Sequence, residues 1–104
     1  MSKVNITSGI CGFHTTINAE SDDGQNVDLE IISECPNFQQ LQKELIHADA
    51  YAECFGKVGE GQVYSAFRKY CPRAACPVPC GVIKAIEVSA GLALPSNAVI
   101  EIHK

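Results

Sequence analysis

Six cysteines are the residues of this 104-residue chain with the most distinctive chemistry, and five of them lie in short motifs. The densest motif, Cys71-x4-Cys76-x3-Cys80, falls in a proline-rich segment between two expected helices. A tight loop can bring three thiolates onto one metal ion, because S–metal bonds of about 2.3 Å require the sulfurs to converge. The sequence therefore predicts a zinc or iron–sulfur site that uses Cys71, Cys76 and Cys80.

A tetrahedral metal site of this kind needs a fourth ligand from elsewhere in the chain. Cys35 is the first candidate, because it is followed by a proline and stands where a helix is expected to begin. Cys11 and His14 are the reserve ligands and form a Cys-x2-His motif. They can share one metal only if a bulge interrupts the strand, since residues three apart on a regular strand point to opposite faces.

Two other interpretations of the cysteines stay open. Cys35 and Cys76 both precede an expected helix start, where the positive end of the helix favours a thiolate, and Arg73 adds positive charge near Cys76. A thiol redox protein with either cysteine as the reactive group fits that pattern. Alternatively, the cysteines are core and cap residues of a non-catalytic protein-interaction module, because free Cys is often buried. Neither His47 nor His103 belongs to a local triad-like motif, so no catalytic residue is assigned.

Composition limits the class of protein. With 46% hydrophobic and 19% charged residues the chain is not disordered, and its length fits a single domain over residues 1–104. No apolar run approaches the roughly 18 residues of a membrane span, and no signal-peptide core follows Met1, so we expect a cytoplasmic protein. A net charge of −4 argues against nucleic acid as a partner. An unidentified protein partner and the oligomeric state stay open.

The elements that would position the cysteines begin with strands. Alternating apolar residues predict a β-hairpin over residues 11–33, with a turn at residues 21–24, and a short strand over residues 4–7. Residues 98–103 alternate in the same way and predict a closing strand.

Apolar residues recur at helical spacing between these strands. The expected helices are one with Phe38, Leu41, Leu45 and Ala48 on a single face, a short one between Asp49 and Gly56, one with Val63, Ala66, Phe67 and Tyr70 on a single face, and one from Pro77 or Pro79 to Gly91. Strands followed by helices and one more strand are typical of an α+β fold. We therefore expect two layers: an N-terminal antiparallel hairpin sheet with three to four helices on one face, and a C-terminal strand.

Several segments of the chain resemble a known family. They are residues 11–16 (CGFHTT), 34–36 (ECP), 76–79 (CPVP), 84–88 (KAIEV) and 91–95 (GLALP). In these the chain resembles a family of small cysteine-containing proteins of anaerobic bacteria and archaea, which are about this long and have no assigned activity. The resemblance covers most of the chain and implies no particular chemistry.

A second resemblance, to the TSCPD domain, is limited to two short segments. That domain has Gly-Cys-Pro-Gly-Asn before one helix and Thr-Ser-Cys-Pro-Asp before another, and residues 35–37 and 75–77 occupy comparable places here. Glu34 stands where that domain has Gly, and Val78 stands where it has Asp. The resemblance implies that Cys35 and Cys76 form a spatial pair used for metal or redox chemistry.

Overall fold

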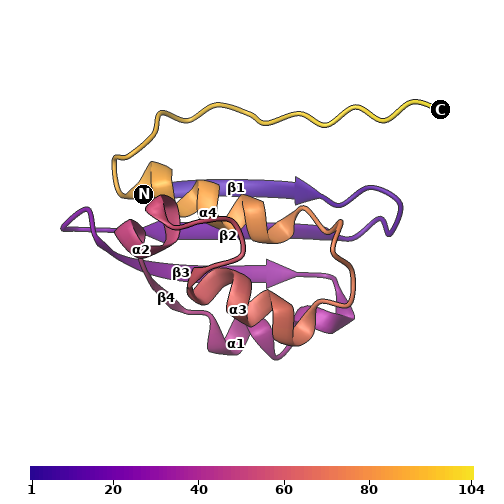
Figure 1. Cartoon of the computed structure of the whole chain (residues 1–104), viewed down its shortest axis with the longest axis horizontal. Helices are drawn as coiled ribbons and strands as arrows, with labels where there is room; N and C mark the ends of the chain where they lie inside the picture. Colours follow the sequence, from indigo (N-terminus) through magenta and orange to yellow (C-terminus); the bar gives the residue numbers. More distant parts are fainter.

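An antiparallel sheet of four strands forms one layer of the computed structural model, which describes residues 1–104, and helices form the other layer (Figure 1). In chain order the elements are β1 (Ser2–Thr7), β2 (His14–Glu20), β3 (Asn26–Ser33), the 3-10 helix η1 (Pro36–Phe38), α1 (Leu41–Glu44), β4 (His47–Asp49), α2 (Ala50–Phe55), α3 (Gly61–Tyr70) and α4 (Val78–Ser89). The strands lie in the order β1-β2-β3-β4, so strands that are consecutive in the chain are also neighbours in the sheet.

The predicted hairpin over residues 11–33 is confirmed as β2 and β3, which pair along most of their length. The side chain of Asp23 holds the turn, because its Oδ1 accepts hydrogen bonds from the backbone N–H groups of Gln25 (2.9 Å) and Asn26 (2.8 Å). These bonds stabilise the carboxylate and lower the pKa of Asp23 to about 2. Gly24 next to it adopts a positive φ of 76°, which residues with a side chain rarely adopt.

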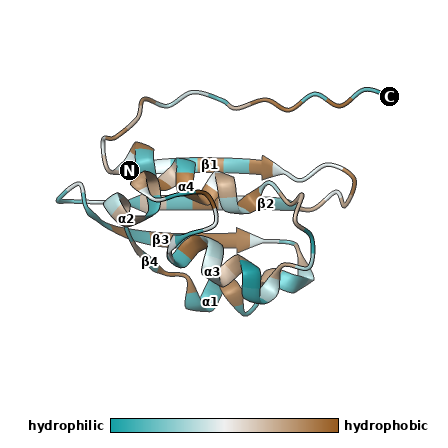
Figure 2. Ribbon diagram, viewed as in Figure 1, coloured by the Kyte–Doolittle hydropathy of each residue, from teal (hydrophilic) through white to brown (hydrophobic).

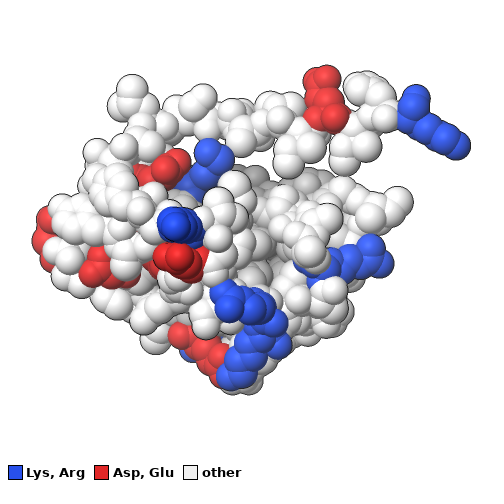
Figure 3. All heavy atoms as spheres, viewed as in Figure 1, with Lys and Arg blue, Asp and Glu red and all other residues white.

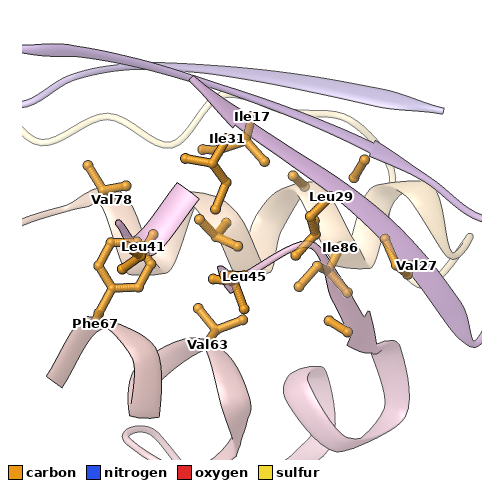
Figure 4. Packing of buried hydrophobic residues seen from close by; sticks show 14 of the residues in the cluster. Ile17, Val27, Leu29, Ile31, Leu41, Leu45, Val63, Phe67, Val78 and Ile86 are labelled. Carbon is orange, nitrogen blue, oxygen red and sulfur yellow. The ribbon is translucent and has the colours of Figure 1, made fainter. Parts of the chain in front are cut away.

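The core lies between the sheet and the helices. Every second residue of the central strands is buried, including Ile17 of β2 and Leu29 of β3, because side chains alternate between the two faces of a strand. Figure 4 shows Val78 of α4, Phe67 of α3 and Ile31 of β3 directed into one continuous apolar cluster. The predicted α+β fold with helices over one face of an antiparallel sheet is confirmed.

The prediction of one helix that carries Phe38, Leu41, Leu45 and Ala48 is wrong. The segment breaks into η1, the single turn α1 and the short strand β4. Leu45 leaves the helical conformation, and Ala48 pairs with Val27 at the edge of β3. Pairing satisfies backbone groups of β3 that a helix there would leave exposed, and Ala48 is buried in either arrangement, which is why the apolar spacing alone did not separate them.

The expected C-terminal strand over residues 98–103 is also absent. The chain beyond α4 is extended from residue 94 to residue 104 but pairs with no strand (Figure 1). Its apolar alternation is typical of a strand, but alternation alone does not show which edge a strand would join, and within this chain the segment joins none. None of the helices has the length and apolar character needed to cross a bilayer.

Candidate functional site

Three of the predicted ligands, Cys35, Cys71 and Cys76, lie at one end of the fold, with Cys76 near both of the others. Cys35 follows β3, Cys71 ends α3 and Cys76 precedes α4, and all three are partly buried against the core. Both Cys71 and Cys35 are near enough to Cys76 to help raise the pKa of its thiol. The end of β3 and the α3–α4 connection lie at the same end of the sheet, together with the β1–β2 loop (Figure 1).

The connection between α3 and α4 closes on the backbone carbonyl of Arg73. This oxygen accepts a hydrogen bond from the N–H of Cys76 (3.2 Å) and lies 3.3 Å from Sγ of Cys71, whose thiol donates to it. Cys71 is fixed from the other side, because its N–H continues α3 by donating to the carbonyl of Phe67 (2.7 Å). The loop therefore brings together two cysteines that are five residues apart.

Local contacts also fix Cys35. Its N–H donates to Oγ of Ser33 (3.1 Å), and its carbonyl accepts the N–H of Phe38 (3.1 Å) where Pro36 begins η1. The ring of Phe38 packs edge-on against Phe67 of α3, with the centroids 5.1 Å apart. This aromatic contact joins the segment after β3 to α3 and so places Cys35 beside the cysteines of the α3–α4 connection.

The electrostatics of Cys76 differ from the expectation. The pKa of the Cys76 thiol is raised to about 11, chiefly by burial and to a smaller extent by the neighbouring Cys71 and Cys35, while the backbone N–H of Val78 at the start of α4 acts in the opposite direction. The predicted lowering of the Cys76 pKa by the helix end is therefore wrong, because burial outweighs one backbone donor. Arg73 takes part through its carbonyl, and its guanidinium is not among the groups that shift this pKa.

The other predicted ligands lie outside this three-cysteine group. Cys80 is exposed in the first turn of α4, and Cys11 is exposed on the β1–β2 loop. His14 begins β2 next to the buried Thr15, so its side chain lies on the helix-free face of the sheet, where its Nδ1 is 3.1 Å from Oγ1 of Thr7. All six cysteines are free thiols, and no three His, Cys, Asp or Glu side chains are already spaced to hold a metal ion.

Cys54 in α2 belongs to a different environment. The pKa of its thiol is raised to about 11, chiefly by burial and in part by the nearby carboxylates Glu87 and Glu53. These partners lie on the last turns of α4 and on α2, whereas the three-cysteine group lies beside the start of α4. Cys54 is therefore a matched control for chemistry at the group: it is also half-buried, but it has no thiol neighbour.

One important side chain that sequence reasoning missed is Glu53 of α2. It is 6% exposed, and its carboxylate accepts the N–H groups of Val63 (2.6 Å) and Gln62 (3.1 Å) in the first turn of α3. Burial raises the pKa of Glu53, although both hydrogen bonds act in the opposite direction. The glycine at position 61, with φ of 91°, is the only sequence signal, because a Cβ there would collide with this carboxylate.

The opposite end of the sheet carries the acidic residues. A hollow of about 190 Å³ beside the β2–β3 turn is lined by Glu20, Asp22, Asp23, Asn26 and Asp28. Figure 3 shows Asp and Glu gathered over this end of the molecule. All of these residues are exposed, so the hollow is a solvated acidic surface.

The chain belongs to a family of unknown function, DUF6951, whose family model matches residues 2–102. The comparisons with curated proteins and with solved structures found no match. The family therefore carries no activity over to this chain, and the three-cysteine group is the feature from which a function can be argued.

Proposed function

We propose that this protein binds a thiophilic metal ion, Zn²⁺ or an iron–sulfur centre, through Cys35, Cys71 and Cys76. The observation that carries the proposal is the interaction of Cys76 with both other thiols, although the three come from different elements of the fold. An all-sulfur donor set suits zinc, copper(I) or iron–sulfur clusters and does not suit magnesium or calcium. The free thiols also fit a reducing compartment, and we place the protein in the cytoplasm as part of the proposal.

A bound cation would offset the cost of ionising these partly buried thiols. The thiol of Cys76 resists ionisation, because burial raises its pKa and the neighbouring Cys71 and Cys35 act in the same direction. A cation at their centre reverses this balance, since metal ligation deprotonates cysteine. The sulfurs are not at ligand spacing, so binding requires the side chains to rotate toward a common centre.

Cys80 is the fourth ligand that we propose. It lies four residues after Cys76 and one turn into α4, and its exposed side chain is free to move. Cys11 on the β1–β2 loop is the reserve ligand at the same end of the sheet (Figure 1). His14 lies on the helix-free face of the sheet, and we leave it out of the proposed site.

The test is metal binding by protein purified without oxygen. Elemental analysis and an absorbance spectrum would identify zinc or iron, and Co²⁺ added to metal-free protein would report thiolate ligands through its sulfur-to-metal charge-transfer bands. We expect Cys35→Ser, Cys71→Ser and Cys76→Ser each to weaken these bands, and Cys54→Ser to leave them unchanged. Full-intensity bands in Cys76→Ser, or no metal in the wild type under these conditions, would refute the proposal.

Stability gives an independent readout. Binding of a structural metal contributes directly to folding, on the order of 10 kcal/mol in zinc-finger peptides. Domains of this size have about 5–15 kcal/mol of net stability. A strong chelator should therefore lower the melting temperature of the metal-loaded wild type and of Cys54→Ser, and add little in Cys35→Ser and Cys76→Ser. An unchanged wild type would exclude a structural metal.

A second function, thiol redox chemistry, is favoured by the closeness of Cys71 and Cys76, which both donate hydrogen bonds to the carbonyl of Arg73. In this case the two thiols reduce a small disulfide such as oxidised glutathione: one S–S bond forms in the protein, one breaks in the reagent, and two glutathione thiols are released. Peptide mass after such treatment separates the two functions. A Cys71–Cys76 disulfide formed equally fast with and without Zn²⁺ would favour the redox function over the metal site.

A further inference from the structure

The C-terminal segment, residues 94–104, lacks a partner. It is extended, makes no backbone hydrogen bond to the rest of the chain, and runs back beside β1 while standing clear of the sheet (Figure 1). Figure 2 shows strongly hydrophobic stretches along it. Leu94, Ile100 and Ile102 are 88%, 76% and 87% exposed, so much of its aliphatic surface is in contact with water.

The side chains of this segment alternate as in a strand with one buried face. Ala98, Ile100 and Ile102 fall on one side, and Val99, Glu101 and His103 fall on the other, where Nε2 of His103 lies 3.8 Å from Oε2 of Glu101. Alternation of this kind is typical of a strand with its apolar side on a core. The segment therefore has the pattern of a sheet strand but pairs with no strand of its own chain.

The sheet has a matching free edge at β1. This strand pairs with β2 only, so the backbone N–H and C=O groups on its other side have no strand partner. Its six residues pair without a bulge and include no proline, and Lys3 is the only charged side chain on it. Edges protected as weakly as this one accept a further strand. The opposite edge, β4, is only three residues long.

The faces of β1 match those of the segment. Val4 and Ile6 point toward the helical layer but remain half-buried, so the apolar core stops short at this edge. An added strand with its isoleucines on that side would continue the core beyond Val4 and Ile6. The same alternation would place Glu101 on the outer face with Lys3, where opposite charges on neighbouring strands attract.

We propose that residues 98–103 of a second copy add as a strand to the free edge of β1, and that two copies exchange these segments reciprocally. In the isolated chain the segment runs in the same direction as β1 in the view of Figure 1 but makes no backbone hydrogen bond to it, which favours the second copy as donor. Exchange of identical segments about a two-fold axis satisfies both edges at once and is a common route to dimers.

The first measurement is the mass of the wild type in solution. Light scattering coupled to gel filtration, from low to high micromolar concentration, should give twice the chain mass of 11.2 kDa. A wild type that stays at one chain mass over this range would overturn the proposal, whether or not its C-terminal segment pairs within the same chain.

Substitutions then test the proposed interface between residues 98–103 and β1. We expect the double variant Ile100→Glu with Ile102→Glu to be a folded monomer, because both side chains are exposed in the isolated chain and are needed only at the interface. The matched control is Ile10→Glu with Val58→Glu, two aliphatic residues that are 97% and 92% exposed in loops, and it should stay dimeric. A dimer that survives the first pair of substitutions would overturn the proposal.

A mixed sample identifies the donor without any variant. Isotope-labelled and unlabelled wild type are combined, and only nuclear Overhauser contacts between the two kinds of chain are recorded. We expect contacts between residues 98–103 and β1 across chains, together with slow amide exchange in both segments. A dimer with rapid exchange in residues 98–103, or with those contacts only inside one chain, would contradict the exchange.

Discussion

Removal of the Glu53 carboxylate tests how the structure assembles its helical layer. Glu53 lies on α2, and both of its carboxylate oxygens accept backbone N–H groups from the first turn of α3. The N-cap residue of α3, Glu60, makes no side-chain capping bond, so the structure assigns the capping of α3 to a residue of the preceding helix. Glu53→Ala would leave the N–H of the buried Val63 without a partner.

The expected loss follows from these contacts. An unsatisfied buried donor costs about 1–3 kcal/mol, and the second donor, on the exposed Gln62, can turn to water. We therefore expect Glu53→Ala to lower the free energy of unfolding by about 2 kcal/mol, which corresponds to a fall of about 8–16 °C in melting temperature for a domain of this size. Urea unfolding followed by far-UV circular dichroism measures the first quantity, and calorimetry measures the second.

Glu60→Ala is the matched control, because it also removes a glutamate side chain near the start of α3 but removes no hydrogen bond. We expect it to change the free energy of unfolding by less than about 0.5 kcal/mol, as for most surface substitutions. Equal losses in the two variants, or a loss below about 1 kcal/mol in Glu53→Ala, would refute the assignment of α3 capping to Glu53.

The pH dependence of the same site has a definite sign. Burial raises the pKa of Glu53 above its ordinary value of 4.5. Between pH 4.5 and the folded pKa, the folded state therefore keeps a proton that the unfolded state has lost. The contribution of this group to stability therefore falls as pH rises from 4.5 through the folded pKa. Glu53→Gln cannot ionise, so the stability advantage of the wild type over this variant should be smaller at pH 7 than at pH 4.

Three further predictions concern other parts of the fold. Gly81→Val would drive a side chain into Ile6 where α4 crosses β1, and should lower the free energy of unfolding by about 1–3 kcal/mol in urea titrations, with partial recovery when Ile6→Ala is added. The pKa of Asp23, about 2 in the folded chain, should be visible in an NMR titration, and the stability it adds should be lost as pH falls from 3.8 toward 2 and be absent in Asp23→Asn. Iodoacetamide at pH 8 should modify the exposed Cys80 well before Cys54, whose pKa is about 11, and equal rates by peptide mass would contradict the effect of burial on Cys54.

The sequence predicted the elements whose signals are local. Alternation and turn chemistry located the hairpin, because the residues around Asp23 and Gly24 stabilise the turn without help from the rest of the chain. The cap at Asp49 was predictable for the same reason, and its Oδ1 accepts the N–H groups of Tyr51 and Ala52. Elements that depend on distant partners were not predictable: Ala48 joins β3 as a strand, and residues 98–103 remain unpaired.

The candidate site was likewise predictable only where its signals are local. Prolines after Cys35 and Cys76 pointed to both helix starts, and these two cysteines do interact in the fold. The contribution of Cys71 depends on the closure of its loop around the Arg73 carbonyl, and the spacing of the motif did not show whether Cys71 or Cys80 would turn inward. The electrostatic expectation for Cys76 failed, because burial is set by packing of distant elements and outweighs the local helix end.

The two proposals use separate parts of the molecule and can therefore fail separately. The three-cysteine group is built on the end of β3, the end of α3 and the start of α4, whereas the exchange uses the far edge of the sheet at β1 and the chain after α4 (Figure 1). Substitutions at distant sites that share no partners have nearly additive effects. The Ile100→Glu, Ile102→Glu variant should thus bind metal with the stoichiometry per chain of the wild type, and Cys76→Ser should remain a dimer. Loss of metal binding on conversion to monomer would instead place a ligand, Cys11 first among them, at the interface between copies.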